Sequence, residues 1–464
     1  MALTARQQAR RHNRRLTLPI HKVDEAEMPI DRLSDVGTGG EFAYEMIKSE
    51  LLLDGQARLN LATFVTTWMP SLGGVLMAET ADKNMIDKDE YPQTAEIESR
   101  CVNILADLWS SPEHESATGC STTGSSEAAM LAGMALKWRW RDRMRAAGKA
   151  TDRPNLVMGA NVQVCWEKFC RYWEVEPRMV PMEGETYHLT ADRAVAECDE
   201  NTIGVVAILG STFDGSYEPV KEISDALDRF ESDRGIYVPL HVDAASGGFV
   251  APFLAPDLEW DFRLARVQSI NASGHKYGLV YPGVGWAIWR DKEALPSDLV
   301  FDVNYLGGHM PTFALNFSRP GSEVVAQYFN FMSLGRDGYT RLMQTLQEIA
   351  TNMARQIADM GPYRLLSDGS ELPVFAFALA PEVVNYTVFD VSERLRESGW
   401  LVPAYTFPEN RQDLSALRIV VRAGMHEEMA DQLIDFMTKQ TEMLEALTEP
   451  LPKVGDGPPA AFKH

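Results

Sequence analysis

The chain has 464 residues, 45% hydrophobic and 24% charged, a composition typical of a folded soluble protein and not of a disordered or fibrous one. Its net charge of -22 argues against nucleic acid as a partner, because a polyanion is bound by a basic surface. No apolar run approaches the ~18 residues of a membrane span. The five scattered cysteines do not form a disulfide framework, so we expect a cytoplasmic protein with reduced thiols and no metal.

Residues 1–58 are predicted to form an N-terminal arm and a helix. The stretch "MALTARQQARRHNRRLTLPIHK" is rich in arginine and lacks the apolar centre of a secretory signal. We interpret it as a basic arm, which is either disordered, part of an inter-subunit contact, or in contact with an anionic membrane. Apolar residues at helical spacing from Phe42 to Leu51 then predict a helix, and Gly55 provides its stop signal.

Residues 59–346 are predicted to form a large cofactor-binding α/β domain, because from about residue 120 to 300 strand and helix patterns alternate. Apolar runs with strand character, such as "NLVMG", "IGVVAILG", "YVPLHVDAA", "VQSINAS" and "GWAIWR", are separated by helical patterns such as "EPVKEISDALDRFESD". This order predicts βαβ crossovers and a mainly parallel sheet with helices on both faces. In such sheets ligands bind beyond the carboxyl ends of the strands. The chemistry is therefore expected in the loops that follow these runs.

Residues 347–464 are predicted to form a smaller α+β domain. Helical patterns such as "LQEIATNMARQIADMG" and "TVFDVSERLRESG" surround the shorter apolar runs "PVFAFALA" and "ALRIVVRAG". The tail "PLPKVGDGPPAAFKH" is rich in Pro and Gly, which favours a flexible end.

The stretch "TTGSSEAAMLAGMALKWRWR" places Gly124, Ser125 and Ser126 directly before a strong helical pattern. Free backbone N–H groups and the helix dipole favour an anion there, so the small hydroxyl residues indicate a phosphate seat. A simple helix cap explains the same residues.

Two further stretches carry a carboxylate and an amine at strand ends. Asp243 closes the run "HVDAASGGF", and Lys276 follows the run "VQSINAS" in "SGHKYG". Taken singly, Asp243 fits a turn-forming residue and Lys276 an exposed loop lysine. Taken with the phosphate seat, they form the set that pyridoxal phosphate requires: an anchor for its phosphate, a carboxylate for its ring nitrogen, and an amine for its aldehyde.

On these motifs the chain resembles the group II pyridoxal-phosphate decarboxylases of the aspartate aminotransferase fold. The stretches "LDGQARLNLATF", "KNMIDKDEYP", "QVCWEKFCRYW", "VNYLGGHMPTFALNFSRP" and "RIVVRAG" resemble, more narrowly, the bacterial and plant type of glutamate decarboxylase. The resemblance runs from about Leu53 to Gly424 and returns in the final "FKH". It implies pyridoxal-phosphate fold type I, with a large mainly parallel sheet domain and a smaller C-terminal domain.

The resemblance implies a role for each cofactor residue. Lys276 would form the Schiff base, and Asp243 would pair with the pyridinium nitrogen. The remaining cofactor-binding positions are Ser125, Ser126, Gln163, Thr212, Ala245, Ser273, His275 and, from a second subunit, Ser318.

The resemblance also implies how L-glutamate is held. Its side-chain carboxylate would meet Thr63, the Phe64 backbone N–H, Asn84 and Asp87, some of them from the neighbouring chain. Arg422 would lie near the α-carboxylate, and Tyr305 would return a proton to Cα. Since two adjacent carboxylates cannot both ionise cheaply, Asp87 predicts activity that rises towards acidic pH.

The expected reaction converts L-glutamate into 4-aminobutyrate and CO2 and consumes one proton, which suits acid resistance or 4-aminobutyrate metabolism. The resemblance implies an obligate homodimer and leaves a hexamer open. No Trp follows Trp400, so calmodulin binding is not expected, while His464 resembles a tail that closes the active site as pH rises. Two alternatives are a pyridoxal-phosphate decarboxylase or lyase for another amino acid, and a non-catalytic scaffold.

Overall fold

The computed structural model describes residues 32–33, 37–304 and 310–451, in two units, Met1–Gln56 and Ala57–His464. In the first unit, α3 (Gly40–Glu50) is followed by a 3-10 turn at Leu51–Leu53. The expected helix is present, but none of its residues is buried, so its apolar side is not packed within that unit. Within the described part of the chain, every helix is too short or too polar to cross a bilayer.

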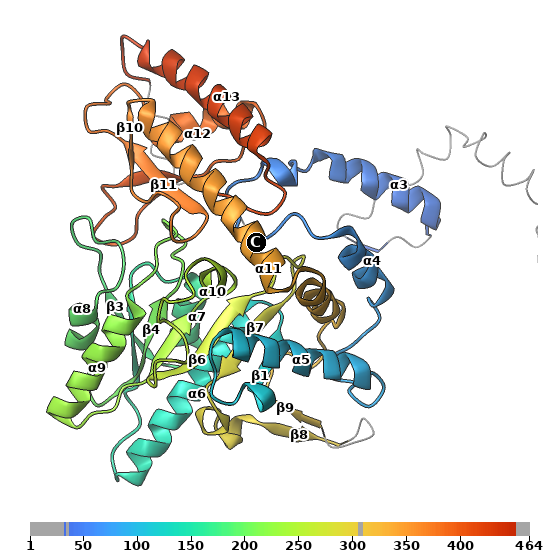
Figure 1. Cartoon of the computed structure of the whole chain (residues 1–464), viewed down its shortest axis with the longest axis vertical. Coiled ribbons are helices and arrows are strands. Elements are labelled where there is room, and N and C mark those ends of the chain that lie inside the picture. The colour runs from blue at the N-terminus through green and yellow to red at the C-terminus, as the bar shows by residue number, and fades with distance from the viewer. Residues whose placement is uncertain (1–31, 34–36, 305–309, 452–464) are drawn as a thin grey trace, which may run out of the picture. The chain divides into compact units, whose positions relative to one another are not determined.

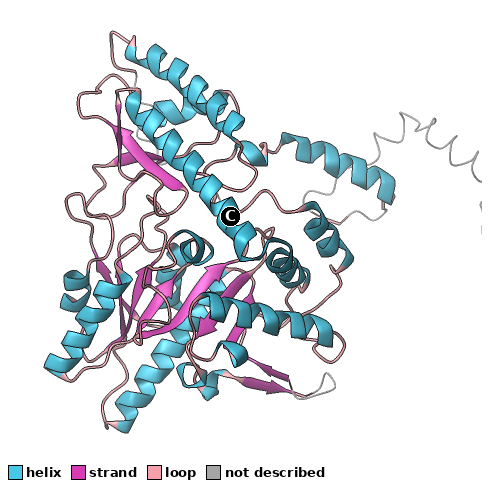
Figure 2. Ribbon diagram, viewed as in Figure 1, coloured by secondary structure: helices cyan, strands magenta, loops and turns pink. Residues whose placement is uncertain are grey.

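The second unit is built on a seven-stranded sheet with the order β1-β7-β6-β5-β4-β2-β3 (Figures 1 and 2). The strands are β1 (Thr118–Thr122), β2 (Asn155–Gly159), β3 (Glu176–Val180), β4 (Thr202–Ile208), β5 (Leu240–Asp243), β6 (Val267–Ser273) and β7 (Gly285–Trp289). From β3 to β6 all neighbours are parallel, and β7 runs antiparallel to both β6 and β1. The carboxyl ends of β5 and β6 therefore lie side by side.

Helices cover both faces of this sheet, as its continuous apolar runs require. Leu156 and Met158 of β2 pack in one buried cluster with side chains of α6 and α7, whereas Val157 faces a second cluster that includes residues of α9. The helices of this part are α4 (Ser71–Glu79), α5 (Pro92–Leu108), α6 (Ser125–Ala146), α7 (Val164–Tyr172), α8 (Ala191–Ala196), α9 (Val220–Arg234) and α10 (Ala251–Leu254).

A smaller antiparallel sheet follows the large one, in the order β10-β11-β13-β12. Its strands are β10 (Tyr363–Leu365), β11 (Val374–Leu379), β12 (Ala404–Thr406) and β13 (Ser415–Val420). It packs with α11 (Ser322–Asp359), α12 (Val388–Glu397) and α13 (Glu427–Glu445). Gly335, with φ of 59°, interrupts the helical geometry of α11 and so divides this long helix. A two-stranded ribbon, β8 (Phe301–Val303) with β9 (Met310–Thr312), precedes α11.

The predicted fold class is confirmed: a large, mainly parallel sheet with helices on both faces, then a smaller α+β part. Three features were not predicted, namely the antiparallel direction of β7 and the edge strands β1 and β3. The sequences "TGCST" and "EPRMV" lack the apolar runs that mark buried strands. The division of the second unit near residue 346 remains a prediction, and that position falls inside α11.

Candidate active site

Lys276 lies in the turn that follows β6, and its amine contacts Ser246 and the ring of Phe64. Its Nζ donates a hydrogen bond to Ser246 Oγ at 3.2 Å and lies 5.2 Å from the centroid of the Phe64 ring. Burial lowers the pKa of Lys276; the nearby Asp243 opposes this shift, and the positive charge of Arg418 adds to it. A lowered pKa raises the fraction of neutral amine, which is the form that attacks a carbonyl.

Asp243 ends β5, and its carboxylate is held by three donors of the same chain. Oδ1 accepts hydrogen bonds from the Ala245 backbone N–H at 3.1 Å and from Asn271 Nδ2 at 3.0 Å, and Oδ2 accepts one from Trp166 Nε1 at 2.8 Å. A carboxylate offers about four acceptor positions, so acceptor capacity remains for one further N–H donor. A protonated ring nitrogen is such a donor.

The predicted phosphate seat lies where α6 begins. Gly124 precedes the helix with φ of 128°, and no side chain caps the free N–H groups of its first turn. Ser273 Oγ, from the end of β6, donates to Ser125 Oγ at 2.7 Å, so the start of α6 and the turn after β6 meet there. A Cβ at Gly285 of β7 would lie only 2.3 Å from the Gly124 carbonyl carbon. The glycine at 285 therefore permits this close approach.

His275 supplies a buried nitrogen that has no partner. Among the described residues, nothing forms a hydrogen bond with its Nδ1, although that atom is buried. Burial lowers the pKa of His275 to about 4, and the charge of Lys276 acts in the same direction. Gly124 lies against the imidazole, since a Cβ there would be 3.2 Å from Cε1.

These groups fit pyridoxal phosphate. The unpartnered His275 Nδ1 and the free N–H groups of α6 suit a phosphate, Asp243 has room for a pyridinium N–H, and Lys276 offers a nucleophilic amine. We call Lys276, Ser246, Asp243 and His275 the lysine site.

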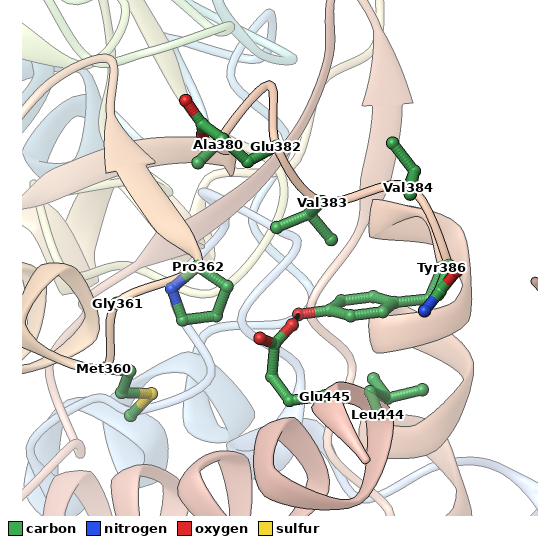
Figure 3. A pocket seen from close by; sticks show the side chains of 11 residues that line it. Met360, Gly361, Pro362, Ala380, Glu382, Val383, Val384, Tyr386, Leu444 and Glu445 are labelled. Carbon is green, nitrogen blue, oxygen red and sulfur yellow. Dashed lines mark hydrogen bonds between the residues drawn. The ribbon is translucent and has the colours of Figure 1, made fainter. Parts of the chain in front are cut away.

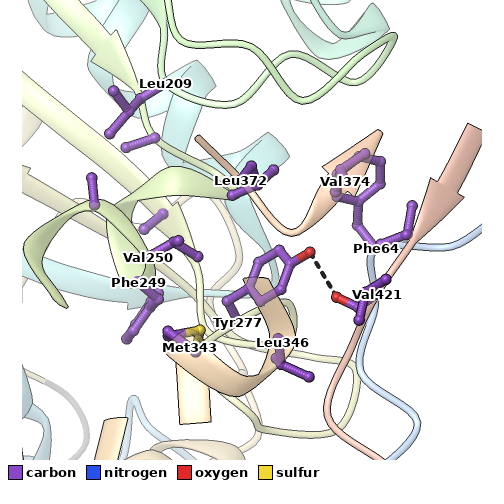
Figure 4. Close-up of a cluster of buried hydrophobic side chains, with 14 of the residues drawn as sticks. Phe64, Leu209, Phe249, Val250, Tyr277, Met343, Leu346, Leu372, Val374 and Val421 are labelled. Carbon is purple, nitrogen blue, oxygen red and sulfur yellow. Dashed lines mark hydrogen bonds between the residues drawn. The ribbon is translucent and has the colours of Figure 1, made fainter. Parts of the chain in front are cut away.

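A buried cluster ties the lysine site to the small sheet (Figure 4). The Tyr277 hydroxyl donates to the backbone oxygen of Val421 at 3.1 Å and approaches that of Pro373 at 3.4 Å. Its ring lies among side chains of both sheets, including Leu209 and Val374. The residue after Lys276 is therefore fixed to the end of β13.

Two arginines of the "RIVVRAG" stretch occupy different surroundings. Arg422, expected at the α-carboxylate, is buried, and its guanidinium donates to Val65 O at 2.7 Å, to Thr67 Oγ1 at 3.0 Å and to the Asn60 carbonyl. These bonds hold the segment that leads to α4. The Nε of Arg422 is buried without a partner among the described residues, as is that of Arg418, so hydrogen bonds alone do not decide between the two arginines.

Arg418 faces the lysine site instead. It lies 4.8 Å from the centroid of the Phe64 ring, the same ring that Lys276 Nζ approaches. It donates to Ala62 O at 2.7 Å and to the Thr212 carbonyl, while its buried Nε has no partner among the described residues. A half-buried cation beside the ring that the amine approaches is suited to a carboxylate.

A second set of expected residues is joined by its own hydrogen bonds. Asn84 Nδ2 donates to Asp87 Oδ2 at 2.9 Å and to Ser318 Oγ at 3.3 Å, and Asn84 Oδ1 accepts from the Arg319 backbone N–H at 3.1 Å. Ser318 is exposed, and Asn84 and Asp87 are half-buried. In the described part of the chain, no hydrogen bond or ion pair joins this exposed patch (Asn84, Asp87 and Ser318) to the lysine site.

The other expected residues have local roles in the chain. Thr63 Oγ1 accepts from the Val65 backbone N–H at 3.1 Å, and Gln163 caps α7 by accepting from the Cys165 N–H at 2.6 Å. Thr212 is half-buried beside Arg418, Ala245 lies next to Asp243, and Ser126 is exposed. Tyr305 and His464 lie outside the described residues.

Three residues of the site were missed by sequence reasoning: Ser246, Trp166 and Arg418. Ser246 stands in the quoted "HVDAASGGF", and a small hydroxyl next to a candidate carboxylate was an available signal. Trp166 and Arg418 offered none, because their contacts depend on which strands become neighbours.

One cavity of about 350 Å³ lies apart from these residues, between the end of α11, the loop after β11 and the end of α13 (Figure 3). At its wall Tyr386 donates a hydrogen bond to Glu445 Oε1 at 2.6 Å. None of the expected site residues lines it. Over the described ranges, no cluster of three or more His, Cys, Asp or Glu side chains could hold a metal.

Comparisons with known proteins agree with this geometry. A family model described as "Pyridoxal-dependent decarboxylase conserved domain" matches residues 42–380. The chain is 54% identical over 409 residues to a glutamate decarboxylase of Aliivibrio fischeri, covering 88% of each, and 48% identical over 424 residues to glutamate decarboxylase 5 of Arabidopsis thaliana, covering 91% of this chain and 86% of that relative.

Solved structures show the same relation. A glutamate decarboxylase of Lactobacillus brevis superposes with a TM-score of 0.88 at 46% identity, over 92% of this chain and 97% of the other. A sphingosine-1-phosphate lyase of Burkholderia pseudomallei superposes with a TM-score of 0.74 at 22% identity, over 92% of this chain and 95% of the other. This second likeness concerns the fold alone.

Proposed function

Because this chain belongs to the pyridoxal-dependent decarboxylase family, we propose that it converts L-glutamate into 4-aminobutyrate and CO2 with pyridoxal phosphate as cofactor. The observation that carries the proposal is that a lysine amine of lowered pKa and the Arg418 guanidinium both approach the Phe64 ring, with the charge of Arg418 acting on Lys276. An amine and a cation at one ring suit a substrate that is an amino acid.

The residues of the lysine site would hold the cofactor by its three functional parts. Lys276 would bind the aldehyde carbon, Asp243 would accept from the ring nitrogen, and His275 would donate to the phosphate together with the first turn of α6. When bound, pyridoxal phosphate supplies a protonated ring that accepts the electron pair of a breaking bond to Cα.

The chain's own groups would then orient the substrate and move one proton. We assign the α-carboxylate to Arg418 in place of Arg422, because Arg418 lies against the Phe64 ring that Lys276 approaches and its charge acts on Lys276, whereas Arg422 bonds the segment before α4. Phe64 would exclude water from the bond that breaks. The proton that replaces CO2 on Cα would come from Tyr305, which remains an expectation from the resemblance.

The exposed patch would serve the side-chain carboxylate of glutamate and the phosphate in a neighbouring subunit. The side-chain hydrogen bonds of its members run within the patch and to Arg319, and none of those in the described ranges reaches the lysine site, which supports a homodimer in which each subunit completes the site of the other. Asp87 beside a substrate carboxylate would favour one shared proton. We also propose a reducing, cytoplasmic setting, because all five cysteines are buried and none forms a disulfide.

The reaction is tested with purified protein, pyridoxal phosphate and a panel of L-amino acids at mildly acidic pH in D2O, with products identified by NMR. We expect 4-aminobutyrate from L-glutamate alone, with one deuterium on the carbon that carries the amine. An amine from a different amino acid would reject the substrate, and no product at any pH would reject the decarboxylase. The exposed Lys221→Ala variant serves as a control, because Lys221 only pairs with surface carboxylates.

The shared site is tested by mixing two inactive variants, Lys276→Ala and a double variant Asn84→Ala with Asp87→Ala. A mixed dimer contains one site with both defects and one intact site. Reassembly of the mixture should therefore restore activity that neither variant has alone. Failure to restore activity, with mixed dimers demonstrated by mass spectrometry, would place the exposed patch and Lys276 in the service of the same subunit.

A further inference from the structure

Two neighbouring strands carry a row of polar side chains into the interior of the large sheet. His241 and Asp243 stand on β5, and Ser269 and Asn271 stand on β6, where they are the register partners of His241 and Asp243. Because strand side chains alternate, all four lie on one face, while Val242 points to the other. His241 and Asn271 are fully buried. Such groups are costly unless every one is hydrogen-bonded.

The four side chains form an unbroken series of hydrogen bonds. His241 Nδ1 lies 2.8 Å from Ser269 Oγ, His241 Nε2 lies 2.7 Å from Asn271 Oδ1, and Asn271 Nδ2 donates to Asp243 Oδ1 at 3.0 Å. Trp166 closes the group from the side, since its ring packs 5.1 Å from that of His241 and its N–H donates to Asp243 Oδ2.

The direction of every hydrogen bond follows from the carboxylate. An ionised Asp243 can only accept, so the amide nitrogen of Asn271 must face it and the amide oxygen must face His241. His241 Nε2 must then carry the proton. Burial lowers the pKa of His241 to about 4, so the ring is neutral near pH 7 and its Nδ1 accepts from the Ser269 hydroxyl. All donors in the series point towards Asp243.

We propose that His241 is a positioning residue that acts through Asn271 to hold the Asp243 carboxylate aimed at the ring nitrogen of the cofactor. The proposal rests on the proposed function, because it assigns that nitrogen as the partner of Asp243. Histidine suits the place: it offers a donor and an acceptor on opposite sides of a rigid neutral ring. Lysine and arginine cannot accept from Ser269.

The first test reads the position of the proton directly. In full-length holoenzyme labelled with 15N-histidine, the two ring nitrogens differ in chemical shift according to which one carries hydrogen, and the His241→Gln variant identifies the signal. We expect a neutral ring protonated at Nε2. A ring protonated at Nδ1, or a doubly protonated ring at pH 7, would overturn the proposal. This reading does not depend on any substrate.

The second test compares two amides at the same position. The side chain of His241→Gln reaches the place of Nε2 and can still donate to Asn271, whereas the shorter side chain of His241→Asn reaches only the place of Nδ1 and Ser269. We expect the Asn variant to release pyridoxal phosphate about tenfold faster, as the loss of about one hydrogen bond to a buried group implies. The Gln variant should stay within about threefold of the parent.

The outcomes separate this proposal from the proposed function. Equal cofactor release from the Gln and Asn variants, at equal thermal stability, would overturn the positioning role even if L-glutamate is decarboxylated. If no amino acid is decarboxylated but cofactor release still differs between the two variants, the positioning role of His241 is supported and the proposed reaction is rejected. If the Asn variant does not fold, the nitrogen shifts of the parent protein decide alone.

Discussion

The lysine site and the exposed patch differ in the burial and the hydrogen bonding of their polar groups. Around Lys276 the neighbouring groups are buried, Asp243 is fixed by three donors, and two cations have lowered pKa values because burial disfavours their charge. Asn84, Asp87 and Ser318 instead lie at or near the surface and bond mainly to one another. The comparison indicates that the lysine site is preorganised inside the chain, whereas the patch is open to a ligand or a neighbour.

The largest expected effect is that of Lys276→Ala. Removing the only amine of the lysine site should abolish both turnover and the visible absorption of bound pyridoxal phosphate, because no nucleophile for the aldehyde remains. The absorption spectrum and product formation by NMR provide the measurement. A variant that still turns over would show that the interior centre is not the reacting one.

The next effect separates the two arginines. Arg418→Met should lower kcat/KM on the order of 100-fold, since it removes the cation beside the Phe64 ring that Lys276 approaches, and it should also lower stability because the Ala62 and Thr212 carbonyls lose a donor. Arg422→Met should instead lower the free energy of unfolding by about 3 kcal/mol, because backbone carbonyls and Thr67 lose their partner. Kinetics and urea unfolding measure both. The reverse pattern would return the carboxylate role to Arg422.

A smaller effect tests the exposed patch. With Asp87 present, kcat/KM for L-glutamate should rise towards acidic pH, because one proton is shared between two carboxylates. Asp87→Asn should flatten this profile, so that the dependence on about one proton disappears. The nearby exposed Asp89→Asn provides a matched control. If Asp87→Asn and Asp89→Asn give the same profile as the parent, proton sharing at Asp87 is refuted.

The smallest expected effect is a loss of folding stability in acid, caused by buried histidines. His275 and His241 both have pKa values of about 4, lowered by burial from an ordinary value near 6.5. The folded state therefore binds fewer protons than the unfolded state between these values. Stability of the cofactor-free protein should be full above pH 6.5 and decline as pH falls towards 4.

The variant His275→Gln should reduce that slope by about one proton. Unfolding in urea at several pH values measures it. An unchanged slope would mean that His275 does not titrate as a buried group. Low pH would therefore raise kcat/KM through Asp87 of the exposed patch and, at the same time, lower the stability that the buried histidines near Lys276 contribute.

Much of the fold was predictable because its strands are continuous apolar runs. The segments "NLVMG" and "VQSINAS" correspond to β2 and β6 residue for residue. The edge strand β1 was missed, since an edge strand needs no such run. The direction of β7 was also missed, because the apolar pattern of a strand is the same in either direction.

The site residues were predictable where their role follows from their position in the sequence, and not where it depends on which elements pack together. Lys276, Asp243 and Ser125 each stand at the end of a strand or the start of a helix, a position that sequence reveals. The choice between Arg418 and Arg422 depends on which of the two side chains faces Phe64. The two residues are four positions apart, along β13 and the segment that continues it, and this spacing alone does not show which one faces the ring. The series of hydrogen bonds from His241 to Asp243 likewise depends on the register of β5 with β6.

The hydrogen bond of Tyr277 to the carbonyl of Val421 has a mechanical consequence. It joins the turn that carries the amine to a strand end of the other sheet, and few rotatable bonds lie between them. A rotation of the small sheet would therefore displace Lys276 together with Arg418, which stands on the same strand. Opening of the small sheet and withdrawal of both groups from a ligand would then be a single movement.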